Sequence, residues 1–197
     1  MGMFEPFNVL TAIPGALIAI MAHEFTKAWV AFKLGDTGIE KQGRLALSGL
    51  FKHVDIIGVA LMVFFGYGWA NPTKLTPFSY KNRKQAMFII FLLPFVVNIF
   101  LGIIFGLMAQ FIVVHVALTF VFLRAAILNV SFALFNLIPV FPLDGSILLS
   151  ALNPSLGLKL APYDMAMRIL LVFFILWSFA GQLFGPITLN ILRVFLG

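Results

Sequence analysis

The stretch LTAIPGALIAIMAHEFTKAWVAFKL, from Leu10 to Leu34, decides the fold of this chain. It is long enough to cross a bilayer, which takes about 20 predominantly apolar residues. Its interior nevertheless holds the ionisable run His23-Glu24-Phe25-Thr26-Lys27. Charged side chains are costly inside a membrane, and where they occur they usually mark a functional site. We therefore expect a transmembrane helix that carries a polar site.

The composition of the whole chain agrees with a membrane location. Of its 197 residues, 62% are hydrophobic and only 10% are charged, and the mean hydropathy is +1.08. A soluble domain is about half apolar and about a quarter charged, and a chain of this length cannot bury so much apolar surface within itself. The composition predicts an all-α polytopic membrane protein with about four to six transmembrane or re-entrant helices. We expect a single membrane-embedded domain over residues 1–197.

The charges outside the first stretch indicate how the chain is oriented. The net charge is +6, but the basic residues lie between apolar runs, so cytoplasmic loops explain them better than a nucleic-acid partner does. No nucleic acid is therefore expected, and a prokaryotic plasma membrane is the expected location. The first stretch is not a cleavable signal peptide, because it has no basic N-terminal region and carries charges in its interior.

Four further apolar segments follow the first stretch, at residues 56–70, 86–114, 116–138 and 165–196. Segment 56–70 is short for a full crossing, and the loops on either side of it, 35–55 and 71–85, are both basic. We favour a re-entrant segment over a tilted short helix, because it places both loops on the cytoplasmic side. The last segment is expected to break at Gly185-Pro186, and loop 35–55 is expected to hold a small amount of β-structure.

A second polar cluster lies in the stretch NLIPVFPLDG, residues 136–145. Its prolines break a helix, so its backbone should line a cavity or be buried in protein. His23 and Lys27 are one helical turn apart and share a face of the first helix, with Glu24 beside it. We predict that Asp144 meets His23 in a shielded polar pocket. The chain has no cysteine, so any metal would need His, Asp or Glu ligands.

Both clusters resemble the motifs of a known family. The run His23-Glu24-x-x-Lys27 resembles the H-E-x-x-H of the site-2 proteases, and residues 136–145 resemble their second motif, N-x-x-P-x-x-x-x-D-G. Pro94-x-x-x-Asn98 is similar to the membrane-embedded Pro and Asn of that family, although Leu93 stands where a Gly is expected. The resemblance covers about residues 10–150 and is strongest to compact prokaryotic members that lack a PDZ domain.

The resemblance implies an intramembrane zinc protease that cuts the transmembrane helix of a membrane-protein substrate. It implies that His23 and Asp144 bind zinc, that Glu24 is the general base, and that Asn136 orients or polarises the scissile carbonyl. Pro94 and Asn98 are implied to belong to the binding region.

The chain departs from the family pattern at Lys27, which takes the place of the second His. An ammonium has only donors and cannot bind a metal, and losing its proton opposes a reference pKa near 10.4. His53 is a candidate third ligand, because it precedes the second apolar segment in an H-x-D stretch that resembles the family's.

Two readings with different functions therefore stay open. In the first, the chain is a working zinc metalloprotease. In the second, Lys27 neutralises Glu24 or Asp144, and the protein binds membrane helices or partner proteins without a metal. A small transporter or proton relay ranks last, because the spans hold too few polar residues for a continuous path.

Overall fold

The computed structural model describes residues 5–111 and 115–196, with the side chains of Leu47 and Pro77 left out. These residues form only helices, turns and extended connections. The α-helices are α1 (Pro6–Lys33), α2 (Gly38–Lys41), α3 (Ile56–Phe65), α4 (Arg83–Phe111), α5 (Val116–Phe135), α6 (Asp144–Leu152), α7 (Pro154–Leu160), α8 (Asp164–Leu176) and α9 (Phe179–Leu196). The 3-10 helices are η1 (Leu47–His53), η2 (Pro77–Ser79) and η3 (Ala161–Tyr163).

Four of these helices, α1, α4, α5 and α9, are long and apolar enough to cross a membrane. The protein is therefore an all-α, multi-pass membrane protein, as its composition predicts. Two details of the sequence prediction are wrong. Loop 35–55 forms α2 and η1 and has no strand, and the last apolar segment breaks between α8 and α9 near Ser178, so that Pro186 lies inside α9.

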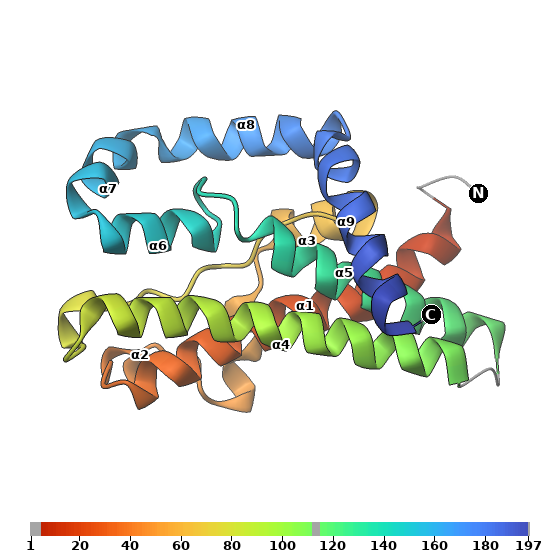
Figure 1. Cartoon of the computed structure of the whole chain (residues 1–197), viewed down its shortest axis with the longest axis horizontal. Helices are drawn as coiled ribbons and strands as arrows, with labels where there is room; N and C mark the ends of the chain where they lie inside the picture. Colours follow the sequence, from red (N-terminus) through yellow and green to blue (C-terminus); the bar gives the residue numbers. More distant parts are fainter. Residues whose placement is uncertain (1–4, 112–114, 197) are drawn as a thin grey trace.

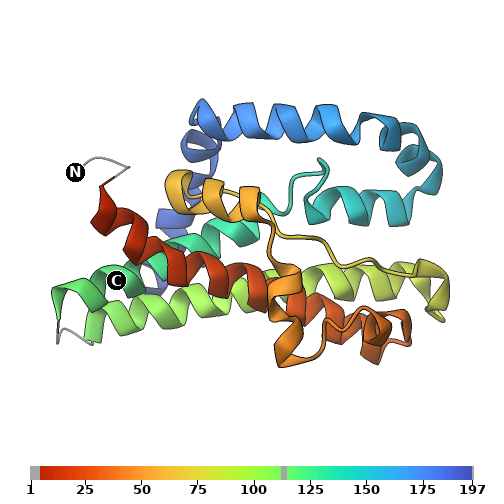
Figure 2. The same ribbon diagram turned by 180° about the vertical axis from the view of Figure 1, so that it is seen from behind.

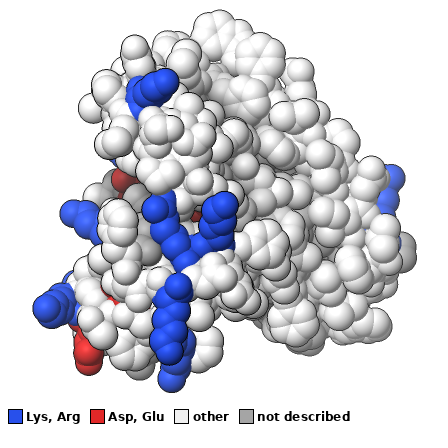
Figure 3. Space-filling model, turned by 60° about the vertical axis from the view of Figure 1, so that its left-hand side comes forward, with Lys and Arg blue, Asp and Glu red and all other residues white. Residues whose placement is uncertain are grey.

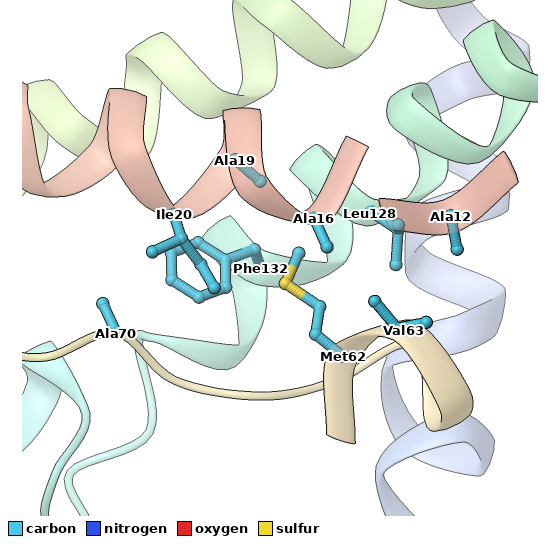
Figure 4. Packing of buried hydrophobic residues seen from close by; sticks show 9 residues of the cluster. All are labelled: Ala12, Ala16, Ala19, Ile20, Met62, Val63, Ala70, Leu128 and Phe132. Carbon is cyan, nitrogen blue, oxygen red and sulfur yellow. The ribbon is translucent and has the colours of Figure 1, made fainter. Parts of the chain in front are cut away.

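The bundle is built on α1, α4 and α5, which pack against one another. In Figure 1, α1 and α5 run in the same direction and α4 runs in the opposite direction. Small residues allow the close approach of α1 and α5, since a Cβ atom on Gly15 would lie 2.6 Å from the Cα of Ala125. Figure 4 shows the adjoining core, where Ile20 of α1 and Met62 of α3 meet Phe132 of α5.

The segment after η1 is a hairpin made of a short helix and an extended return. Helix α3 ends at Gly66, whose φ of 84° is left-handed, and the chain then turns back along the helix. The two arms touch at Gly58, where a Cβ atom would lie 2.0 Å from the carbonyl oxygen of Trp69. The backbone N–H of Asn71 donates to the carbonyl of His53 at 2.9 Å. The segment thus ends beside its start, which is the geometry that a re-entrant segment requires. That loops 35–55 and 71–85 lie on the same side of the membrane stays a prediction.

The C-terminal part forms an arm that folds over the bundle. Helices α6, α7 and α8 make this arm, and α9 then returns to pack against α4 and α5. In Figures 1 and 2, the extended chain after α3 runs between the arm and α4 towards the start of α4. A cavity of about 570 Å³ lies between this extended chain, α4 and the arm. The fold thereby brings a helix of the bundle, a loop and the arm around one interior space.

The hairpin makes a testable prediction about topology, and the absence of cysteine from the chain makes single-cysteine labelling simple. The side chains of Ser48, Ser79 and His115 are exposed. In oriented vesicles, we expect an impermeant maleimide to label Ser48→Cys and Ser79→Cys from one side. His115→Cys should be labelled from the other side, because α4 crosses the membrane between residues 79 and 115. Labelling of positions 48 and 79 from opposite sides would contradict the re-entrant hairpin.

Candidate functional site

The two polar clusters of the sequence meet in one buried group. Helix α1 contributes His23, Glu24 and Lys27, which are 1%, 1% and 2% exposed, and α6 contributes Asp144, which is 4% exposed. His23 Nε2 lies 2.8 Å from Asp144 Oδ2, although these residues are 121 positions apart. The predicted meeting of residues 23 and 144 in a shielded polar pocket is confirmed.

The proline-containing loop positions Asp144 at the first residue of α6. Helix α5 ends at Phe135, and the loop closes where the backbone N–H of Gly145 donates to the carbonyl of Asn136 at 2.9 Å. A Cβ atom on Gly145 would lie 2.5 Å from the carbonyl oxygens of both Leu137 and Ile138. Only glycine fits this close approach, so the Asp-Gly pair of the sequence has a direct steric reason.

The side chain of Asn136 turns away from the ion group. Its Nδ2 donates to the carbonyl of Phe132 at 2.9 Å, within the last turn of its own helix. The structure therefore brings Asn136 to the loop that carries Asp144 without giving it a hydrogen bond to the group.

Helix α4 holds His23 from the other side of the ring. Asn98 Oδ1 lies 2.9 Å from His23 Nδ1, while Asn98 Nδ2 donates to the carbonyl of Ala19 and to Asn129 Oδ1. Because Asn98 Nδ2 makes both of these donations, Asn98 Oδ1 is the atom that faces Nδ1 of the ring. A ring held in this way directs Nε2 at the site, as is usual for metal-ligating histidines. Pro94 is buried one turn earlier in α4 and has no hydrogen bond to the group.

Lys27 lies between the two carboxylates. Its Nζ donates to Glu24 Oε1 and to Asp144 Oδ1. The pair of ionic contacts links α1 to α6 and offsets part of the carboxylate charge in a buried part of the protein. Helix α1 supplies the ammonium and one carboxylate, and α6 supplies the other carboxylate.

The second oxygen of Glu24 is also engaged. Thr73 donates to Glu24 Oε2 from its backbone N–H at 2.8 Å and from its Oγ1 at 2.7 Å, and Arg44 Nη1 lies 3.9 Å away. The sequence prediction missed both residues. Thr73 follows the aromatic turn of the hairpin, and Arg44 belongs to the basic loop before it, so the hairpin alone brings them to Glu24.

His53 holds Arg44 and does not join the ion group. Arg44 Nη1 donates to His53 Nδ1 at 3.1 Å, and His53 Nε2 donates to the carbonyl of Arg44, also at 3.1 Å. Arg44 also donates to the carbonyls of Asn71 and Pro72, which fixes the extended return beside Glu24. Both ring nitrogens of His53 are thus occupied, and the structure does not place it as the third ligand.

The donor set does not fit a catalytic zinc in this chain. His23, Glu24 and Asp144 each offer a ligand atom, and these atoms lie within 4.8 Å of one another. A catalytic zinc takes three protein ligands and keeps one open position, and the family pattern reserves Glu24 for the base. In the motif that residues 23–27 resemble, the third ligand stands at the position of Lys27. The ammonium of Lys27 has no lone pair and already binds oxygen atoms of Glu24 and Asp144.

Comparison with known proteins identifies the class. A membrane-spanning bundle with a buried His-Glu-Asp group defines a membrane metalloprotease-like protein. The chain is 32% identical over 159 residues to the Bacillus subtilis (strain 168) protein named "Putative zinc metalloprotease YwhC", a similarity that covers 76% of this chain and 70% of that protein. The chain belongs to this zinc metalloprotease family. No family model matches the chain, and no solved structure matches it.

The contact between His53 and Arg44 predicts a pH dependence of stability. Burial lowers the pKa of His53 below its ordinary value of 6.5, so the unfolded chain binds more protons than the folded protein as the pH falls. The free energy of unfolding in detergent should therefore fall between about pH 7.5 and 5, by at most about 1.4 kcal/mol per pH unit for this group. His53→Gln preserves a donor and an acceptor but does not titrate. We expect it to flatten the pH profile, and an unchanged slope would contradict this assignment.

Proposed function

We propose that this chain is a site-2-protease-like protein of the prokaryotic plasma membrane that binds the transmembrane helix of a client protein without cutting it. The observation that carries the proposal is the position of Lys27, whose Nζ donates to both Glu24 and Asp144. In this proposal, the ammonium of Lys27 occupies the space that a working enzyme would use for the metal and its third ligand.

The contacts of Glu24 support the absence of catalysis. A general base needs a carboxylate oxygen within hydrogen-bond reach of the water it deprotonates. Here Oε1 accepts from Lys27 and Oε2 accepts twice from Thr73. Because both oxygens are occupied and the side chain is 1% exposed, Glu24 is held as a structural anion.

The cavity beside the ion group supports client binding. Its volume of about 570 Å³ falls in the range of ligand sites. Its lining is largely apolar, with a few polar groups, and includes Thr73, Met87, Phe141, Ser146, Ser150 and Leu158. Met87 and Ile147 also line a small void that reaches Lys27 and Asp144, so a client in the cavity would lie next to the ion group. An apolar helix with a locally unwound polar turn fits such a lining.

A working zinc protease is the second candidate, and one observation favours it. His23, Glu24 and Asp144 have ligand atoms within 4.8 Å of one another, and the chain belongs to a family named for zinc. Metal binding would require Lys27 to lose its proton and to leave both carboxylates. The zinc analysis described next separates the two candidates.

Zinc analysis of the purified protein and of Lys27→His tests the proposal. A site with only two ligands holds zinc weakly, so we expect less than roughly a tenth of a zinc ion per chain in the wild type. In Lys27→His, which adds a third ligand, we expect about one zinc ion per chain. Lys27→Gln is the matched control, since it removes the charge but adds no ligand. The His variant should also begin to cut an apolar helical reporter, which the wild type only binds, as measured by energy transfer in vesicles.

Two results would contradict the proposal. One is about one zinc per chain in the wild type at neutral pH, lost in Asp144→Asn, since it would establish a metal centre that includes Lys27 or Glu24. The other is a reporter helix that shows no energy transfer to the wild type, since it would remove client binding even if no metal is present.

A further inference from the structure

A second hollow lies at the end of the molecule where α1 stops and α4 begins. Its volume is about 480 Å³, and it lies between residues 33–35 at the end of α1 and residues 79–89 around the start of α4. None of its lining residues lines the cavity beside the ion group. The two spaces are therefore separate, and a ligand of this hollow is independent of the proposed function.

The lining of the hollow contains polar and basic residues. Lys33 and Lys81 supply two positive charges, both from exposed side chains. The polar neighbours in the lining are Ser79, Tyr80, Asn82 and Gln85, and no acidic residue is among the lining residues. Figure 3 shows the wider setting, in which basic side chains gather at this end of the molecule and few acidic ones accompany them.

The nearest carboxylate does not cancel this charge at the surface of the hollow. Asp36 is fully buried and accepts hydrogen bonds from the backbone N–H groups of Gly38 and Thr76 and from the hydroxyl of Tyr80. These hydrogen bonds of the Asp36 carboxylate hold the loop after α1 against the loop before α4. The two lysines remain available to an anion that enters from outside.

The lining also contains apolar residues from the end of α1 and from α4. These residues are Leu34, Ala86 and Ile89. Trp29, one turn before Lys33, is 48% exposed, and the ammonium of Lys33 lies 5.8 Å from the centre of its ring. Tryptophan is enriched at membrane–water interfaces. We therefore expect the hollow to lie at headgroup level, where its lysines can meet a phosphate and its apolar residues an acyl chain.

We propose that this hollow binds the headgroup of an anionic phospholipid, with the phosphate at Lys33 and Lys81 and the start of an acyl chain along Leu34 and Ile89. Basic pockets on the cytoplasmic side of membrane proteins bind such headgroups. Inorganic phosphate could make the same contacts with Lys33 and Lys81, but it has no apolar part that would pack against Leu34 and Ile89. A lining that contains both lysines and apolar side chains therefore favours a lipid over free phosphate.

Native mass spectrometry of the full chain tests this site. The protein is released from micelles that contain equal amounts of phosphatidylglycerol and phosphatidylcholine, and bound lipid is counted. We expect preferential retention of phosphatidylglycerol. Each lysine near the membrane surface contributes about fivefold to the binding of an anionic lipid. The double variant Lys33→Gln/Lys81→Gln should therefore weaken that retention about 25-fold. The matched control is Lys41→Gln/Lys159→Gln, which removes two exposed lysines from the same end and should change retention less than about twofold.

Three results would overturn the proposal. Equal retention of the two lipids would remove the anionic preference. An equal loss in both double variants would attribute binding to the general charge of this end. Displacement of phosphatidylglycerol by inorganic phosphate at a similar concentration would make the hollow a phosphate site.

Discussion

The ammonium of Lys27 between the carboxylates of Glu24 and Asp144 is the interaction on which the rest of the structure depends. A charge that is buried in a membrane protein must be paired, because the desolvation of a lone ion costs several kcal/mol. Each of the three groups is almost fully buried, so none can turn to water if a partner is lost. Removing one partner of a buried pair typically costs about 3–5 kcal/mol. The ion group thus holds α1 against α6, because separating the two helices would leave buried charges unpaired at a large cost in free energy.

The surrounding loops serve this group from two directions. Gly145 allows the loop after α5 to close tightly enough to present Asp144. On the opposite side, the hairpin returns Thr73 to Glu24, and Arg44 with His53 holds that return in place. Between these loops, the carboxylates of Glu24 and Asp144 are engaged by side chains of the chain itself. The neighbouring cavity of about 570 Å³ remains beside this group, and the proposed binding of a client helix rests on it.

The sequence alone predicted the spans and the central contact. Long apolar runs are required by lipid, so α1, α4 and α5 begin or end within a few residues of the predicted limits. The contact of His23 with Asp144 was predictable because a charge at membrane depth needs a polar partner. The two polar clusters, residues 23–27 and 136–145, could partner each other. The return of segment 56–70 followed from the basic loops on both sides of it.

Other features had no signal in a single sequence. The contacts of Thr73 and Arg44 with Glu24 depend on how the hairpin folds back, and periodicity does not record a tertiary contact of that kind. The break between α8 and α9 falls at Ser178 and not at Gly185-Pro186, since a proline is tolerated inside a membrane helix when its neighbours satisfy the backbone. His53 resembled a ligand by its place in the chain, whereas its ring is committed to Arg44.

The most direct measurement of the central claim is solid-state NMR on the protein in bilayers, with ¹⁵N in the lysine side chains and ¹³C in the Asp and Glu carboxylates. Among its eight lysines, we expect one Nζ signal, absent in Lys27→Gln, to show strong dipolar coupling to two carboxylate carbons, corresponding to separations of about 3–4 Å. Loss of one coupling in Asp144→Asn would assign it. A Lys27 signal with no carboxylate coupling, or one that moves on addition of zinc, would contradict the account.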